Sequence, residues 1–131
     1  MTQVEHFDLQ QVERLFGDIS VVSSCSKEAP RVGAYLRCAA QDEEYIAAQL
    51  AEIRQYLEDR GWELAGTYVD NGYSGNSDRR PALLQLRQDI QDGQVDVIIV
   101  SSLARLFRSF SRLQCFLRLL QEHRVGLVCL K

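Results

Sequence analysis

The sequence lacks the features that would mark a membrane, secreted or metal-binding protein. It contains no hydrophobic run long enough to span a bilayer, no secretory signal peptide and no lipidation motif. Its four cysteines form no C-x-x-C pair and show no other close spacing typical of zinc ligands. We therefore expect a cytoplasmic protein without a membrane partner, a metal ion or another cofactor, whose core contains the reduced thiols of Cys38, Cys115 and Cys129.

Lysine is also scarce, because thirteen of the fifteen basic residues are arginine. The net charge of −3 excludes a generally basic protein, but the charges are unevenly distributed. From Val97 to Lys131 the only acid is Glu122, against six basic residues, Arg105, Arg108, Arg112, Arg118, Arg124 and Lys131. Arginine binds phosphate in a bidentate manner, so this third of the chain is expected to face a phosphodiester. The alternative is a solvated helix face, which we expect for Arg112 and Arg118.

Strand and helix patterns alternate from Arg31 onwards and predict an α/β fold with a mostly parallel four-stranded sheet and helices on both faces. Residues 1–30 are expected to form an N-terminal extension and linker, and residues 31–131 the folded domain. Tyr45, Leu84 and Phe110 are placed in the inward apolar stripes of their helices. The expected strands are 31–38, 62–70, 95–100 and 125–130, and the expected helices are 41–60, 81–91 and 109–123.

Three polar segments are expected to converge, because each follows a strand and parallel strands end at the same edge. Arg37 closes the first buried strand, a glycine- and serine-rich loop covers residues 71–80, and a turn covers residues 101–107. Arg105 and Arg108 are three positions apart and share one face if that turn is helical. We expect Arg37 to face an anion at this edge, although a structural pair with Asp70 is the simpler alternative.

The motifs in these segments resemble those of the serine site-specific recombinases, the resolvase and invertase family. That family has Y-x-R-V-S after the first strand, S-G-x-x-x-x-R-P-x-L after the second and D-R-x-x-R after the third. The matching segments cover roughly three quarters of the chain, and although each motif is weak alone, their order and spacing are specific. They are Tyr35-Leu36-Arg37-Cys38-Ala39, Ser74-Gly75 through Arg80-Pro81-Ala82-Leu83, and Ala104-Arg105-Leu106-Phe107-Arg108, with Gln49 in the first helix.

The resemblance implies the resolvase-like three-layer α/β fold and DNA strand cleavage and rejoining through a phosphoserine intermediate, without a metal ion. It implies DNA as the partner, bound by its phosphate backbone, together with a homo-oligomer or another recombinase chain. Gln49 would orient the site and Ser74 would contact the phosphate. By the same resemblance, the phosphate would lie among Arg37, Arg80, Arg105 and Arg108.

Two positions depart from the family pattern. Ala39 stands where the family has its nucleophilic serine, and Ala104 stands where it has an acid. We therefore expect phosphate binding without cleavage. Cys38 is a poor substitute because neighbouring strand residues point to opposite faces, and Ser74 and Ser77 lie in a loop. The sequence leaves open whether Ala39 is natural or engineered, although the second loss at Ala104 favours natural decay.

Three functions remain open at this point. The first is a truncated recombinase catalytic domain without the dimerisation helix and DNA-binding domain that would follow Lys131. The second is a non-catalytic pseudo-recombinase that binds DNA or a recombinase partner. The third is a flavodoxin-like binder of a small phosphate compound, which would predict small-ligand binding that duplex DNA does not displace.

Overall fold

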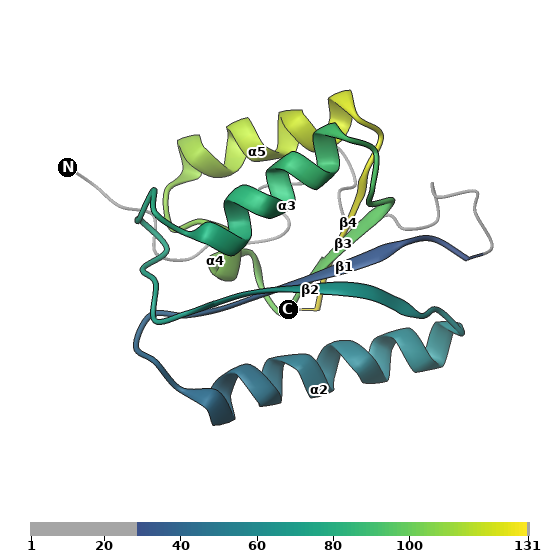
Figure 1. Ribbon diagram of the computed structural model, residues 1–131, viewed down its shortest axis with the longest axis horizontal. Helices are drawn as coiled ribbons and strands as arrows, with labels where there is room; N and C mark the ends of the chain where they lie inside the picture. Colours follow the sequence, from purple (N-terminus) through teal and green to yellow (C-terminus); the bar gives the residue numbers. More distant parts are fainter. Residues whose placement is uncertain (1–28, 131) are drawn as a thin grey trace.

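The computed structural model describes residues 29–130, so most of the expected N-terminal extension lies outside the described residues (Figure 1). Four strands and four helices follow one another along this part of the chain, with two consecutive helices between the third and fourth strands. The strands are β1 (Val32–Cys38), β2 (Leu64–Asn71), β3 (Val97–Val100) and β4 (Gly126–Cys129). The helices are α2 (Glu43–Arg60), α3 (Pro81–Gln91), α4 (Leu103–Leu106) and α5 (Phe110–Glu122).

All paired strands run parallel, in the order β2-β1-β3-β4. Helix α2 covers one face of this sheet, and α3 and α5 cover the other (Figure 1). This arrangement confirms the predicted three-layer α/β fold with helices on both faces. No helix of the described residues has the length and hydropathy of a membrane span.

Strand β1 is the centre of the fold, because all of its residues are buried. Ala34 and Leu36 pack in the apolar cluster on the α2 side, whereas Tyr35 packs in the cluster on the α3 and α5 side. This is the alternation expected of a strand covered on both faces. It carries the side chain of Arg37 to the carboxyl edge of the sheet, on the same face as Tyr35.

The predicted helix boundaries are close to the observed ones, because local capping groups set them. The Asp42 carboxylate accepts a hydrogen bond from the backbone nitrogen of Tyr45 at 3.1 Å and caps α2. Gly61 ends that helix with a φ of 69°, in the left-handed region that glycine adopts readily. Pro81 opens α3, where its missing N–H costs no helical hydrogen bond.

Several side chains assigned to the core are exposed or only half-buried, and these predictions were wrong. Tyr45 is 45% exposed and Leu84 is 56% exposed, while Phe110 is half-buried. Tyr45 and Leu84 are each next to a member of the true stripe, whose buried residues lie three or four positions apart, such as Ile46, Gln49 and Ile53 in α2. Phe110 is in register with the stripe of α5, three positions before Leu113, but lies in the first turn of that helix. The predicted burial of one cysteine fails in the same way, because Cys115 is exposed.

The segment after β3 also differs from its prediction as a turn. It contains the short helix α4, followed by an extended Phe107 that begins the link to α5. Arg105 is in α4, but Arg108 lies beyond its end. The two arginines therefore do not share one helix face.

Candidate functional site

The structure brings together four arginines from three separate segments at the carboxyl edge of the sheet. The Arg105 carbonyl accepts hydrogen bonds from Arg37 Nε at 2.9 Å and from Arg80 Nη1 at 3.3 Å. In return, Arg105 Nη1 donates to the Arg37 carbonyl at 3.2 Å. Arg108 lies across Gly75, whose Cα is so close that an added Cβ would be 2.6 Å from Arg108 Cγ and 3.1 Å from Arg37 Nη2. We call Arg37, Arg80, Arg105 and Arg108 the arginine cluster.

Arg37 joins the three segments through its guanidinium group. Its side chain is 2% exposed, and all three guanidinium nitrogens donate to backbone carbonyls. Besides the Arg105 carbonyl, the acceptors are the carbonyls of Tyr73 at 2.9 Å and Ala104 at 2.8 Å. Arg37 therefore ties the β1 edge to the loop after β2 and to α4.

Arg80 performs a similar task from the residue before α3. Its side chain is 1% exposed and donates to the carbonyls of Arg105 and Leu106, with the guanidinium 4.8 Å from the centre of the Phe107 ring. The final carbonyls of a helix have no intrahelical donor, so a four-residue helix depends on outside donors. Arg37 and Arg80 together supply these donors to Ala104, Arg105 and Leu106.

Gln49 holds the backbone from which Arg37 extends. Its Nε2 donates to the Arg37 carbonyl at 2.9 Å, and its Oε1 accepts from the Arg37 amide nitrogen at 3.4 Å. Pairing between β1 and β3 reaches only Ala34 and Ile99, so the last residues of β1 have no strand on that side. The buried Gln49 amide takes the place of the missing strand, since an amide offers the same donor and acceptor as a peptide group.

Asp70 is a residue of this region whose role the sequence did not reveal. It is fully buried and does not pair with Arg37, which corrects the simpler interpretation of that arginine. Its carboxylate accepts from the Tyr35 hydroxyl at 2.7 Å and from the first backbone nitrogens of α3, those of Ala82 at 2.9 Å and Leu83 at 3.1 Å. The signal was present, because α3 begins with Pro81 and has no side-chain cap of its own.

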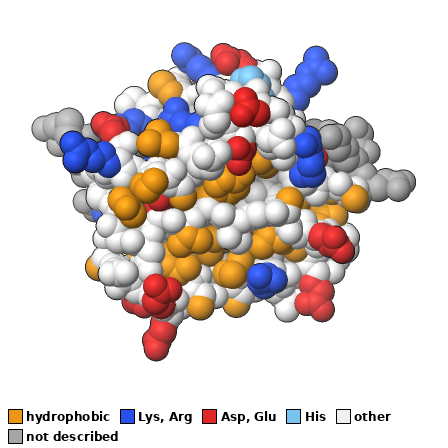
Figure 2. Space-filling model, in the orientation of Figure 1, with side chains coloured by type: hydrophobic (Ala, Val, Ile, Leu, Met, Phe, Trp, Pro, Cys, Tyr) orange, Lys and Arg blue, Asp and Glu red, His pale blue; other side chains and the backbone are white. Residues whose placement is uncertain are grey.

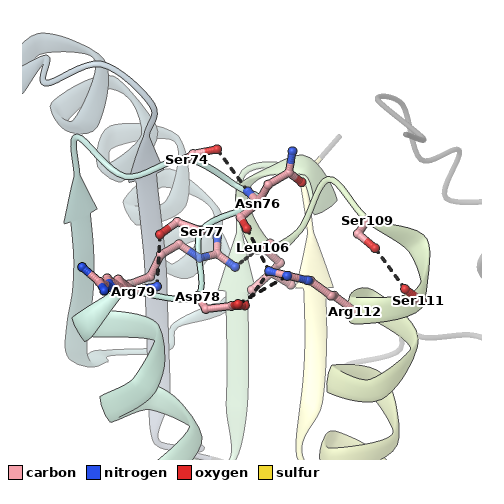
Figure 3. A network of polar contacts seen from close by, with 10 residues as sticks. Ser74, Asn76, Ser77, Asp78, Arg79, Leu106, Ser109, Ser111 and Arg112 are labelled. Atoms are coloured by element: carbon pink, nitrogen blue, oxygen red, sulfur yellow. Dashed lines mark hydrogen bonds and ion pairs between the residues drawn. The ribbon is translucent and has the colours of Figure 1, made fainter. Parts of the chain in front are cut away.

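The loop between β2 and α3 lies against the cluster at Gly75, which is close to Arg108 and Arg37. Figure 3 shows the polar contacts of this loop. Ser74 is exposed on this loop and its hydroxyl accepts from the Asn76 nitrogen at 3.2 Å. Arg112 reaches from α5 and binds the Asn76 carbonyl at 2.9 Å and the Asp78 carboxylate at 2.6 Å. Arg112, which was expected to be solvated, remains 39% exposed but is held in this surface ion pair, and Arg118 is exposed as predicted.

The two alanines lie on the segments that carry the cluster. Ala39 directly follows β1 and is exposed, and Ala104 is part of α4, with its carbonyl bound to Arg37. Cys38 points away from them into the apolar cluster on the α2 side, and its thiol donates to the Ala40 carbonyl at 2.7 Å. Neither alanine offers a hydroxyl or a carboxylate. The loop between β2 and α3 presents the exposed hydroxyl of Ser74 to solvent.

No carboxylate of the described residues pairs directly with the cluster, although the charge of the buried Asp70 acts on Arg80. Within residues 29–130, no carboxylate forms an ion pair or hydrogen bond with any of its four arginines, and Arg108 has no hydrogen bond at all. Burial, followed by the charges of Arg105, Arg80 and Arg108, lowers the pKa of Arg37 to about 10. Burial lowers the pKa of Arg80 as well. A tetrahedral oxyanion would relieve this mutual repulsion and match the guanidinium donors.

The wider charge distribution agrees with such a site. Figure 2 shows one face of the molecule, on which basic side chains lie mostly over the layer of α3 and α5, where acidic side chains are also present, whereas the charged side chains over α2 are mostly acidic. No group of three or more potential metal-ligating side chains occurs in the part of the chain that the structure describes.

Comparisons with known proteins agree with the motifs. The family model described as "Resolvase, N terminal domain" matches residues 32–131. The N-terminal catalytic domain of TP901-1 integrase is 28% identical, with 76% of this chain and 77% of that chain covered and a TM-score of 0.72. A resolvase family site-specific recombinase from Streptococcus pneumoniae is 25% identical, with 77% and 72% covered and a TM-score of 0.68.

A third solved structure supports the fold alone. The C-terminal catalytic domain of ISC1926 TnpA, an IS607-like serine recombinase, is 22% identical, with 77% and 67% covered and a TM-score of 0.71. Among proteins of curated function, none matches the chain.

Proposed function

The chain belongs to the resolvase N-terminal domain family, and from this premise we propose that it binds the DNA phosphate backbone without cleaving it. The observation that carries this proposal is the arginine cluster, in which four guanidinium groups lie together without a carboxylate partner among the described residues. Such a group of charges is costly to bury unless an anion compensates it. We also propose the division of the chain into an extension over residues 1–30 and a resolvase-like domain over residues 31–131.

The chemistry of phosphoryl transfer explains why a phosphodiester fits this cluster. Charge accumulates on the equatorial phosphate oxygens, and preorganised cations stabilise it. Arg105 and Arg108 are half-buried and reach solvent, whereas Arg37 and Arg80 are buried and hold the α4 carbonyls. We therefore assign direct phosphate contact first to Arg105 and Arg108, and a supporting role to the two buried arginines.

Ala39 and Ala104 are the reason that cleavage is not proposed. The methyl group of Ala39 provides no nucleophile. The methyl group of Ala104 provides no carboxylate to orient the arginines or balance their charge. Loss of a nucleophile removes most of the rate of a covalent mechanism. The partners that we propose are the DNA backbone and a second recombinase-like chain, with Ser74 as a further phosphate contact on the rim.

Restoring the missing groups tests this assignment. We would place residues 31–131 with Ala39→Ser and Ala104→Asp in a chimera that supplies a recombinase dimerisation helix and DNA-binding domain. Denaturing gels would then detect covalent protein–DNA adducts. We expect an adduct from the double variant and none from the chimera with both alanines. An adduct from the alanine form would refute the proposed inactivity, and a folded, DNA-bound double variant without adduct would refute the site assignment.

A further inference from the structure

A small cleft lies beside the arginine cluster, between α3 and the loop that precedes it. Its volume is about 250 Å³, and Arg80 and Arg87 contribute guanidinium groups to its lining. Leu84 and Phe107 contribute apolar walls, and Asp78 contributes the one carboxylate. We call it the α3 cleft.

Both arginines of the α3 cleft have unused hydrogen-bonding capacity. Arg80 Nε is the only buried side-chain nitrogen or oxygen within the described residues that has no hydrogen-bond partner. Arg87 has no hydrogen bond or ion pair in that part of the chain. Its guanidinium stacks instead on Phe107 and Phe116, at 5.7 and 5.6 Å from the ring centres. A buried donor without a partner costs free energy, so a ligand that supplies an acceptor is favoured there.

The charge balance of the cleft favours an anion. Asp78 already forms an ion pair with Arg112 at 2.6 Å, so its charge is largely compensated from outside the cleft (Figure 3). Arg80 and Arg87 form no ion pair within the described residues. Burial limits the hydration of both guanidinium groups and lowers the pKa of each, although the charge of Asp70 acts in the opposite direction on Arg80 and that of Asp78 on Arg87. Leu84 is exposed at the mouth, so the cleft opens to solvent at an apolar edge.

We propose that the α3 cleft is a second oxyanion site, in which Arg87 contacts a phosphate group and the buried guanidinium of Arg80 adds its positive charge. The phosphate is either part of the DNA backbone or a free phosphate ion. If it is part of the DNA backbone, this inference rests on the proposed function. The apolar walls from Leu84 and Phe107 suit the sugar carbons that flank a backbone phosphate. Arg87 thereby extends the contact surface beyond the four arginines of the cluster.

A charge at the mouth of the cleft provides the sharpest test. Leu84→Glu places a carboxylate there, whereas Leu84→Gln has a similar size without charge. Both changes are at an exposed position, and a glutamate early in α3 is favourable for the helix, so the fold should persist. Arg87→Gln removes the cation itself. The matched control is Arg118→Gln, at an exposed position on α5.

Two measurements distinguish the sources of the phosphate. The first is the salt dependence of binding to duplex DNA, where each lost phosphate contact lowers the log–log slope by about 0.9. The second is the rise in Tm with inorganic phosphate, compared with chloride at equal ionic strength. Leu84→Glu and Arg87→Gln should lower the slope by about 0.9 and reduce the phosphate-induced rise in Tm. Leu84→Gln and Arg118→Gln should change neither quantity.

The remaining outcomes are also decisive. A reduced Tm response with an unchanged DNA slope would support the α3 cleft as a site for free phosphate. If neither quantity changes in Leu84→Glu and Arg87→Gln, the α3 cleft is not an oxyanion site, even where Arg108→Gln still lowers the slope. A wild-type chain without salt-dependent DNA binding would instead refute the proposed function, and the phosphate titration would then decide the fate of the cleft.

Discussion

Replacement of Gln49 by methionine should destabilise the domain, because its side-chain oxygen accepts the hydrogen bond from the buried N–H of Arg37. The change keeps an unbranched side chain of similar length in the apolar layer under α2. It removes the hydrogen bond to the Arg37 carbonyl at 2.9 Å and the one from its amide nitrogen at 3.4 Å.

The two lost bonds have different consequences. The Arg37 carbonyl keeps the donor Arg105 Nη1 at 3.2 Å, so it remains satisfied. The Arg37 N–H has no second acceptor among the described residues and becomes a buried, unpaired donor. Such a group costs about 1–3 kcal/mol in the free energy of unfolding. For a domain of this size, each kcal/mol lowers the Tm by roughly 4–8 °C.

Urea unfolding followed by circular dichroism measures this loss, and the same helix provides a control. Gln55 is exposed on α2, and its amide reaches only Asp59, at 3.0 Å. Gln55→Met should therefore change the free energy of unfolding by less than about 0.5 kcal/mol. Equal unfolding midpoints for Gln49→Met and Gln55→Met would show that Gln49 does not support the Arg37 backbone.

Two further predictions follow from the contacts around the cluster. Gly75→Ala should force Arg108 to move, because the new Cβ would lie 2.6 Å from its Cγ. We expect the free energy of unfolding in urea to fall by about 1–3 kcal/mol, and the salt-dependence slope of DNA binding to fall as in Arg108→Gln. Gly66→Ala is the control and should be neutral, because its Cβ meets no atom within 4 Å. Burial raises the pKa of Tyr35, and its hydroxyl donates to Asp70. Because the folded pKa exceeds the unfolded value of about 10, this group stabilises the fold fully below that pH and progressively less above it. In the folded protein Tyr35 should not ionise near pH 10, so Tyr35→Phe should leave the absorbance change at 295 nm in that pH range the same as in the wild type. A smaller absorbance change in the variant would contradict the buried hydrogen bond.

Much of the fold followed from patterns that depend on neighbouring residues alone. The order of strands and helices, the cap at Gly61 and the proline that opens α3 are local signals. The errors at Tyr45 and Leu84 arose because each lies next to a buried position, and an apolar side chain there looks like part of the stripe. Only the packed sheet shows that Gln49, a polar residue, faces inward instead.

The candidate site was less accessible to sequence reasoning. The motifs identified the arginines, but they did not show that Arg37 and Arg80 donate hydrogen bonds to the carbonyls of α4. That use depends on a four-residue helix and on where β3 ends, and neither has a clear sequence signal. Asp70 was missed as the cap of α3 because its partners, the backbone nitrogens of Ala82 and Leu83, are twelve and thirteen residues away.

The salt dependence of duplex DNA binding by Arg108→Gln tests the central claim most directly. Arg108 has no hydrogen bond within residues 29–130, so its replacement should leave the fold intact and remove one phosphate contact. We predict a log–log slope smaller than that of the wild type by about 0.9, with Arg118→Gln unchanged. Equal slopes for the wild type and both variants would contradict a phosphate-binding arginine cluster.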